Sequence, residues 1–359
     1  MIAVTKTFLP PFDEYTHILK RAWDKVWITN NGELLQELES KLASYLGARN
    51  VLFCANGTVV LQLALKAMNI TGEVITTPFS YVATTNVVLW ENCTPVFVDI
   101  ENKSFCIDAD KIEAAITPKT QAILATHVFG NPCNVEKIAA IAQKHGLKVI
   151  YDGAHAFGSV YKGKQVLAYG DVSTCSFHAT KILHTVEGGC LVTDNDELAE
   201  QLRLIRSFGH LGDDYYAVGI NGKNSEFHAA MGLANLPYLP SIMQNRKQIS
   251  EWYDTLLSPL GLQRPVSPEG TSYNYSYYPV LFKSEASLLK VKNALQENGI
   301  VPRRYFYPSL NTLPYLKNAP ACPVSESVAG RILCLPLFFE MEEGIVKKIC
   351  GIIAVSTLT

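Results

Sequence analysis

Short apolar runs alternate with helix-like patterns through the first 240 residues of the chain. The apolar runs are nearly continuous and rich in β-branched residues, which is typical of strands buried on both faces. The segments between them repeat apolar positions at helical spacing over about 10–15 residues. We expect strands at residues 51–55, 73–78, 95–100, 122–130, 148–152, 172–177 and 190–195, and helices at 58–69, 80–92, 108–116 and 134–146. This alternation predicts an α/β fold with a mostly parallel central sheet flanked by helices.

The pattern changes near residue 240. A long helical pattern covers residues 224–257, and Pro237 and Pro240 should each end or kink that helix. Shorter apolar and helical runs follow at 277–282, 287–299, 331–339 and 343–355. These runs indicate a smaller α/β module, and a chain of 359 residues is long enough for about two domains. We therefore predict a large domain over residues 1–240 and a small C-terminal domain over residues 241–359.

Charge and composition exclude several classes of protein. The 31 lysines and arginines nearly balance the 33 aspartates and glutamates, giving a net charge of −2, whereas a nucleic-acid binder would show a basic field. The hydrophobic fraction of 48% excludes a disordered chain. We therefore expect no nucleic-acid partner. An anionic small ligand is compatible with this balance, because a pocket needs only a few local donors.

The start of the chain and its cysteines favour a cytoplasmic location. The opening MIAVTKTFLPPFDEY lacks the basic and apolar regions of a signal peptide, and no run reaches 18 apolar residues. The nine cysteines form no CxxC pair, and the eight histidines show no ligand spacing with them. We therefore predict a soluble cytoplasmic protein with reduced thiols, no membrane partner and no metal site.

The segment 149–193 carries the clearest chemical signal. Asp152 lies at the carboxyl end of a predicted strand, where open α/β sheets bind ligands. Lys181 follows another strand in SFHATK and precedes a Glu-Gly-Gly turn. This pairing suits pyridoxal phosphate (PLP), because a lysine can form a Schiff base with the aldehyde while an aspartate keeps the ring nitrogen protonated. On spacing alone, Asp152 could instead cap a turn and Lys181 could be an ordinary solvated lysine.

The motifs in their order resemble the DegT/DnrJ/EryC1/StrS aminotransferases, which are PLP enzymes of fold type I. The resemblance covers almost the whole chain through WITNNGELLQELESKLASYLG, ANGTVVLQLAL, TPFSYVATTNVV, YDGAHAFG, SFHATK, EGGCLVT, GINGKNSEFHAA and LPL. The motifs SFHATK and NSEFHAAMG resemble those of the family branch that makes 4-amino-4,6-dideoxyhexoses on dTDP. The resemblance implies a homodimer that transfers an amino group from L-glutamate to a dTDP-4-keto-6-deoxyhexose. The implied product is dTDP-4-amino-4,6-dideoxyglucose, a precursor of surface polysaccharide such as O-antigen.

The resemblance also implies roles for individual residues. The cofactor set is Lys181 as the Schiff-base lysine and proton carrier, Asp152 at the ring nitrogen, His155 at the phenolic oxygen, Ser176, Gly57 and Thr58 at the phosphate, and Tyr81 stacked on the ring. A helix N-terminus at Gly57 and Thr58 independently favours an anion, because its amides are free. The alternatives are core packing for Tyr81, a backbone-bonded strand serine for Ser176, and a structural buried histidine for His155.

Two histidines and one glycine lie near these residues in the chain. His178 and His184 are six residues apart, a spacing that does not place them on one helical face, so we expect them to form pocket walls and not metal ligands. Gly153 stands where the family more often has alanine, and a smaller residue should not disturb the Asp152 carboxylate.

Other segments resemble the parts of the family that contact the substrate and the second subunit. In GINGKNSEFHAA, Asn221 is the candidate for reaching the partner's cofactor phosphate, with Lys223 as a further cation. If it does so, each active site is shared between subunits. The substrate candidates are Thr29 and Asn30 in the 27–32 loop, and Arg303, Arg304 and Tyr305, beside Tyr307, in 302–310. Arginines suit a diphosphate and tyrosines suit thymine, although both arginines could face solvent and 221–223 could be a solvated loop.

Two other functions remain open at this point. The same scaffold could aminate C3 of a dTDP-3-keto-6-deoxyhexose. The chain could also be a regulatory protein that keeps the PLP fold without catalysis. The intact set of Lys181, Asp152 and Ser176 disfavours the regulatory alternative, as does the lack of an appended helix-turn-helix segment.

Overall fold

The computed structural model describes residues 1–317 and 319–358 of the chain. Its centre is a seven-stranded sheet in the order β2-β10-β9-β6-β5-β3-β4. The strands are β2 (Asn50–Cys54), β3 (Glu73–Thr76), β4 (Thr94–Phe97), β5 (Thr120–Thr126), β6 (Lys148–Asp152), β9 (Val172–Ser176) and β10 (Gly189–Thr193). Strand β10 runs antiparallel to both of its neighbours, and the remaining pairs are parallel. The predicted mostly parallel sheet is confirmed.

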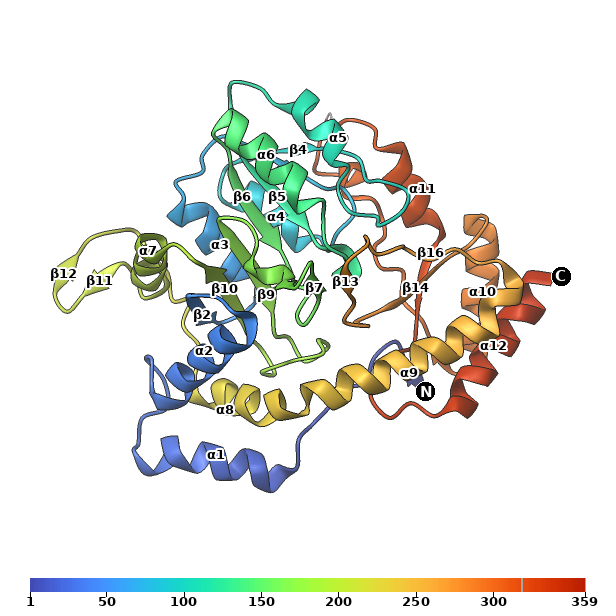
Figure 1. The fold of residues 1–359 in the computed structure, drawn as a ribbon, viewed down its shortest axis with the longest axis horizontal. Coiled ribbons are helices and arrows are strands. Elements are labelled where there is room, and N and C mark those ends of the chain that lie inside the picture. The colour runs from blue at the N-terminus through green and yellow to red at the C-terminus, as the bar shows by residue number, and fades with distance from the viewer. Residues whose placement is uncertain (318, 359) are drawn as a thin grey trace.

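Helices cover both faces of this sheet (Figure 1). One face packs against α3 (Gly57–Ala67), α4 (Ala83–Trp90) and α7 (Asp196–Arg206). The other face packs against α2 (Glu33–Leu46), α5 (Ala109–Ile112), α6 (Val135–His145) and α8 (Glu226–Asn235). Because both faces are covered, the strands read as nearly continuous apolar runs.

The two prolines divide the long helical pattern as expected. Helix α8 ends at Asn235, a 3₁₀ turn covers Leu236–Tyr238, and α9 spans Leu239–Leu257. Pro237 and Pro240 each lie in the first turn of the helical segment that follows, where a missing amide hydrogen is tolerated. In Figure 1, α8 and α9 follow one another below the sheet and lead to the C-terminal elements.

The C-terminal elements enclose a separate apolar core. They are β14 (Tyr278–Leu281), α10 (Glu285–Glu297), β15 (Ile300–Val301), β16 (Ile332–Leu335) and α12 (Glu343–Leu358), together with α9. Helix α11 (Pro323–Arg331) instead packs into the core that also contains α5 and α6. Strand β14 pairs antiparallel with β16, and β1 (Ile2–Ala3) pairs parallel with β15. The start of the chain therefore contacts its C-terminal part, which the sequence pattern did not indicate. The domain division at residue 240 stays a prediction.

Several elements were not expected, and β3, β4, β5, β9 and β10 all end earlier than the predicted strands. The predicted strand 122–130 ends at Thr126, because Phe129 has a left-handed φ of 56° within the turn Val128–Gly130. The unexpected elements include α1 (Phe12–Asp24), β7 (Val160–Tyr161), β8 (Lys164–Gln165), β11 (His210–Leu211), β12 (Asp214–Tyr215), β13 (Thr271–Ser272) and the 3₁₀ turns Glu113–Ala115, Val166–Ala168, Ser258–Leu260 and Leu310–Thr312.

Two further findings bear on the sequence analysis. Among the described residues, no helix has the length and apolar character needed to cross a membrane. All nine cysteines are buried and unpaired.

Candidate active site

The carboxyl edge of the sheet brings Asp152 and Ser176 together. Asp152 ends β6 and Ser176 ends β9, which is the parallel neighbour of β6. The Asp152 carboxylate is only 5% exposed and has a donor on each oxygen. The amide of Ala154 donates to Oδ1 at 3.0 Å, and the hydroxyl of Thr84 donates to Oδ2 at 2.7 Å. Asp152 therefore caps a turn, as the alternative interpretation had it, but a second donor also holds it.

Lys181 lies in the turn after β9 and lines a pocket, which excludes the solvated-lysine alternative. Its Nζ is 3.2 Å from the hydroxyl of Tyr277. The pocket is lined by Ala154, His155, Phe157, Ser176, Thr180, Lys181, Ile182, Ser276 and Tyr277. Burial lowers the pKa of the lysine, but the groups around it, Tyr277 first and Asp152 among the others, raise it, and the net direction is upward.

His155 is buried in the same pocket among aromatic rings. Its ring stacks on Phe306 with centroids 5.1 Å apart and meets Tyr277 edge-on at 5.2 Å. Burial lowers the pKa of the imidazole well below its usual value, so the ring is neutral. The Nδ1 atom is buried and has no hydrogen-bond partner among the described residues. A buried ring nitrogen without a partner is free to bind a polar ligand atom.

Gly57 and Ser176 form a close contact beside this pocket. A Cβ atom on Gly57 would lie 2.7 Å from Cβ of Ser176, so only glycine fits at this first position of α3. Asn56 caps the helix by accepting from the amides of Thr58 and Val59 at 3.0 and 2.9 Å. The predicted amide at Thr58 is therefore already bonded within the chain, and its side chain is exposed. An asparagine before a helical pattern is a recognisable cap, so Asn56 could have been named from the sequence.

Tyr81 and Gly153 lie close to these residues in the chain, and the structure bears on both. Tyr81 is 59% exposed, which excludes core packing as its role. At Gly153 a Cβ atom would lie 2.0 Å from Cδ2 of Leu167. Leu167 therefore occupies the space that an alanine would need, and the Asp152 carboxylate is undisturbed.

Three residues that the sequence analysis missed hold the pocket or the residues next to it by hydrogen bonds. Thr84 bonds Asp152, and no sequence signal marked it. Tyr277 bonds Lys181 and lies in the aromatic run YNYSYY, which could have drawn attention. Arg246 holds this run by donating to the carbonyls of Tyr275 and Ser276 at 2.9 and 2.6 Å, and burial lowers the pKa of this guanidinium to about 10.

The two histidines near Lys181 do not form pocket walls, contrary to the prediction. His178 is exposed and its Nδ1 lies 2.8 Å from the Thr180 hydroxyl. His184 is buried elsewhere, with Nε2 2.6 Å from the carbonyl of Phe8. Neither is among the residues that line the pocket. In residues 1–317 and 319–358, no group of three or more His, Cys, Asp or Glu side chains is arranged to hold a metal.

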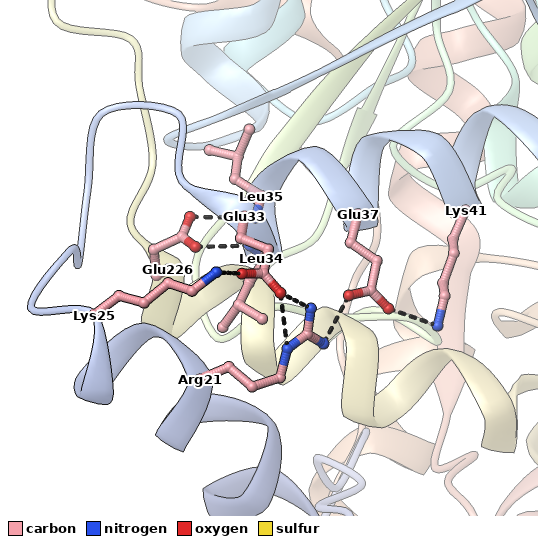
Figure 2. Close-up of polar contacts among 8 residues, drawn as sticks. All are labelled: Arg21, Lys25, Glu33, Leu34, Leu35, Glu37, Lys41 and Glu226. Carbon is pink, nitrogen blue, oxygen red and sulfur yellow. Dashed lines mark hydrogen bonds and ion pairs between the residues drawn. The ribbon is translucent and has the colours of Figure 1, made fainter.

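Glu226 holds the loop that contains Thr29 and Asn30. Both loop residues are exposed, and Asn30 has a left-handed φ of 58°. The carboxylate of Glu226 is 1% exposed and accepts from the amides of Leu34 and Leu35 at 2.7 and 3.2 Å, which caps α2 (Figure 2). The amide of Glu226 donates to the carbonyl of Ile28 at 3.0 Å. One residue therefore fixes both ends of the loop.

Asn221 and Lys223 lie just before Glu226 in the chain. The backbone of Asn221 bridges to Ser207, and its side chain is exposed. The Nζ of Lys223 lies 4.7 Å above the ring of Phe208, and burial together with Arg206 lowers the pKa of this lysine. These side chains are placed on the surface of a single chain, and the proposed partner subunit is not part of the structure.

The two arginines of the 302–310 segment differ in their surroundings. Arg304 donates to Glu285 at 2.6 Å and to the carbonyl of Gly330 at 3.1 Å, and it stacks on Tyr307 at 3.4 Å. Arg303 is exposed, and its guanidinium lies 5.6 Å from the ring centre of Tyr305. Arg304 is therefore bound within the chain, whereas Arg303 is exposed to solvent.

Comparison with known proteins agrees with this geometry. Residues 13–354 match the family described as the DegT/DnrJ/EryC1/StrS aminotransferase family. The chain belongs to this family. It is therefore a PLP-dependent aminotransferase that acts on nucleotide sugars.

Individual members of the family align along nearly the whole chain. A dTDP-4-amino-4,6-dideoxy-D-glucose transaminase from Shigella dysenteriae is 40% identical over 359 residues, covering 98% of this chain and 98% of the relative. A UDP-N-acetyl-3-dehydro-alpha-D-glucosamine 3-aminotransferase from Acidithiobacillus ferrooxidans is 35% identical over 360 residues, covering 98% of this chain and 96% of the relative. The crystal structure of DesI in the presence of its TDP-sugar product superposes with a TM-score of 0.94 at 32% identity, covering 99% of this chain and 93% of DesI.

The pocket of this aminotransferase fits PLP on its own chemistry. It offers an amine at Lys181, and the carboxylate of Asp152 at the same sheet edge accepts a hydrogen bond on each oxygen. His155 contributes a buried nitrogen without a partner. Gly57 brings the first turn of α3 directly against Ser176, so the helix N-terminus and the serine lie side by side at the pocket.

Proposed function

We propose that this aminotransferase transfers the amino group of L-glutamate to a dTDP-4-keto-6-deoxyhexose and forms dTDP-4-amino-4,6-dideoxyglucose. The reaction would take place in the cytoplasm and supply a sugar for surface polysaccharide. The observation that carries the aminotransferase chemistry is the position of two groups at the same sheet edge. These are the amine of Lys181 in the pocket and the carboxylate of Asp152, which accepts a hydrogen bond on each oxygen. The relative from Shigella dysenteriae supports the choice of sugar.

The catalytic roles follow from the charges of the two residues. Bound PLP supplies an aldehyde that accepts the amino group and a ring that withdraws electrons from the reacting carbon. Asp152 holds a proton on the ring nitrogen, because a fixed carboxylate stabilises the positive charge there. Lys181 Nζ moves the proton between the reacting carbon atoms, acting as base and then as acid.

The remaining pocket residues bind and orient the cofactor in this proposal. Ser176 and the Gly57 amide hold the phosphate at the N-terminus of α3, where the helix dipole favours an anion. His155 bonds the phenolic oxygen through its ring, and Tyr81 covers one face of the cofactor. Thr58 contributes its exposed hydroxyl, since its amide is already bonded to Asn56.

The substrate side uses exposed groups. We propose that Arg303 binds the diphosphate and Tyr305 the thymine, with Thr29 and Asn30 near the sugar. In a homodimer, Asn221 and Lys223 of one subunit would reach the cofactor phosphate of the other. Arg304 supports this surface by its ion pair with Glu285.

Turnover with defined sugars tests the proposal. Purified enzyme is incubated with L-glutamate and either dTDP-4-keto-6-deoxyglucose or the 3-keto isomer, and 2-oxoglutarate and amino sugar are measured. We expect efficient turnover of the 4-keto sugar. The relative from Acidithiobacillus ferrooxidans is named for amination at C3, so preferential turnover of the 3-keto sugar would establish that second candidate instead. A visible spectrum that does not respond to glutamate would support the regulatory alternative.

A further inference from the structure

Three buried hydroxyl groups form a line that ends at Asp152. The hydroxyl of Thr84 donates to Oδ2 of Asp152 at 2.7 Å, and Ser80 Oγ lies 2.8 Å from Thr84 Oγ1. Thr126 Oγ1 donates to Ser80 Oγ at 3.1 Å. All three side chains are at most 1% exposed. The proposed function assigns no role to any of them.

The topology of the sheet brings these groups together. Thr126 and Asp152 are partner residues at the last positions of the adjacent parallel strands β5 and β6. Ser80 follows β3, which is the other neighbour of β5, and Thr84 lies four residues later in the first turn of α4. The line of hydroxyls therefore crosses the carboxyl edge of three neighbouring strands.

The directions of the protons follow from the chemistry of the groups. Each hydroxyl has one proton, and an ionised carboxylate only accepts. The hydroxyl hydrogen of Thr84 therefore points at Asp152, so the Thr84 oxygen must accept the hydrogen bond from the Ser80 hydroxyl. Ser80 in turn accepts from Thr126. All three O–H dipoles point toward the carboxylate, and bonds in such a chain polarise and strengthen one another.

We propose that Thr84 is a positioning residue for the aminotransferase reaction. Its hydroxyl holds the Asp152 carboxylate in the orientation that meets the cofactor ring nitrogen. The amide of Ala154 holds the other oxygen at 3.0 Å, so the two donors together define the plane of the carboxylate. This inference rests on the proposed function, in which Asp152 binds that nitrogen.

Three substitutions on α4 separate this role from simple packing. Thr84→Val keeps the shape of the side chain and removes the donor, whereas Thr84→Ser keeps the donor. Thr85→Val is the matched control, because Thr85 is the next residue and is equally buried. Its hydroxyl has no hydrogen-bond partner in the part of the chain that the structure describes. Ser80→Ala is a further variant, which removes the donor to Thr84 and the acceptor of the Thr126 hydroxyl without touching Asp152 directly.

The measurements use the PLP-loaded enzyme and its apoenzyme. They are the PLP dissociation constant from equilibrium dialysis, the visible circular dichroism of bound PLP, which reports its orientation, and the single-turnover rate with L-glutamate. For Thr84→Val we expect a single-turnover rate lower by about 10- to 100-fold, the range for a lost hydrogen bond to a charged group, with weaker PLP binding and altered dichroism. Thr84→Ser should stay within about three-fold of wild type, and Thr85→Val should match it.

The outcomes distinguish this inference from the proposed function. If Thr84→Val does not fold, Ser80→Ala should still lower the rate by about three- to ten-fold, because Thr84 loses the bond that polarises it. Wild-type PLP affinity and dichroism in Thr84→Val would overturn the inference, as would equal damage in Thr84→Ser and Thr84→Val. Asp152→Asn with wild-type rates would overturn the proposed function itself. A slow Asp152→Asn beside a normal Thr84→Val would overturn only the role of Thr84.

Discussion

The edge of the sheet that we propose for the cofactor and the segments that we propose for the substrate are built differently; they are called the cofactor edge and the substrate side below. At the edge, Asp152 and His155 are buried, and strand ends and aromatic rings fix their positions. On the substrate side, Thr29, Asn30 and Arg303 are exposed on loops. The relatives with which this enzyme aligns are named for different nucleotide sugars but share amino transfer. The difference teaches that rigid elements hold the chemistry while loops on that frame are free to set specificity.

The strongest test of the cofactor edge is Lys181→Ala. The lysine bonds only Tyr277 through Nζ at 3.2 Å among the contacts that the structure gives, so the fold should survive its loss. We expect activity to fall by at least about 100- to 10,000-fold, because the proton carrier and the covalent link to PLP are lost together. Turnover assays, the visible spectrum and thermal melting check this. Normal turnover would show that Lys181 has no part in the mechanism. The comparison between the cofactor edge and the substrate side would then have no basis.

Asp152→Asn tests whether charge, and not only position, matters at the cofactor edge. The amide keeps the shape but loses the negative charge, and the Thr84 hydroxyl can still donate to its oxygen. We expect PLP to stay bound while the single-turnover rate with glutamate falls by about 10- to 100-fold or more, since the bond to a charged ring nitrogen is weakened. Rapid-mixing absorbance measures the rate. A rate near wild type would overturn the proposed function, because Asp152 would then not hold the proton on the ring nitrogen.

The sequence predicted where the strand before Asp152 ends because the signals for it are local. A β-branched run followed by Asp152 predicts both a strand and the place where that strand ends, and β6 ends at this residue. The prolines at 237 and 240 likewise predicted the break between α8 and α9. Such features depend on backbone geometry that a short segment determines by itself.

The sequence could not predict contacts between distant segments. The bond from Thr84 to Asp152 joins residues 68 positions apart, and the bond from Lys181 to Tyr277 joins residues 96 apart. Neither threonine nor tyrosine has a spacing that marks such a role. The pocket-wall prediction for His178 and His184 failed for the same reason, since His184 instead meets Phe8, 176 residues away. Tertiary packing decides these contacts.

Subunit mixing tests whether the surface at Asn221 completes the cofactor edge of a partner. Asn221→Ala alone should weaken PLP binding by about 10- to 100-fold, the effect of losing a hydrogen bond to a charged phosphate. Asn221→Ala and Lys181→Ala subunits are then mixed and their exchange is confirmed. In a shared site both lesions fall in one of the two mixed sites, so activity should partly return. No recovery after confirmed exchange would place Asn221 outside the partner's site.

The two adjacent arginines test the substrate side with a built-in control. Arg303→Ala should raise the KM for the nucleotide sugar by about 10- to 100-fold and leave the glutamate half-reaction unchanged, since a charged bond to a diphosphate is lost. Arg304→Ala removes the ion pair with Glu285 and the bond to Gly330, and should mainly lower the free energy of unfolding, by about 1 kcal/mol. Steady-state kinetics measures the KM effect of Arg303→Ala, and urea unfolding measures the stability effect of Arg304→Ala. The reverse pattern would show that Arg304 is the ligand.

The smallest effects are expected at α2, where two glutamates lie in different surroundings (Figure 2). Burial raises the pKa of Glu226, so the folded chain binds more protons and the free energy of unfolding falls as the pH rises above the usual glutamate pKa. Bonds from Lys25 and Arg21 lower the pKa of exposed Glu33 to about 2, so its contribution is present above the usual value of 4.5 and is lost as the pH falls toward 2.

Replacing each of these glutamates by glutamine should therefore change stability in opposite pH ranges. Glu226→Gln should remove the fall in unfolding free energy with rising pH, but it leaves one α2 amide without a good acceptor. We therefore expect a loss of about 1–3 kcal/mol at low pH and a looser substrate loop, seen as a higher KM for the nucleotide sugar. Glu33→Gln should only reduce the loss of stability in acid, and salt should screen that effect because the carboxylate is exposed. Urea unfolding from pH 3 to 8, at low and high salt, measures both. An unchanged KM in Glu226→Gln would show that the 27–32 loop does not contribute to substrate binding. The loop would then no longer belong to the substrate side of the comparison.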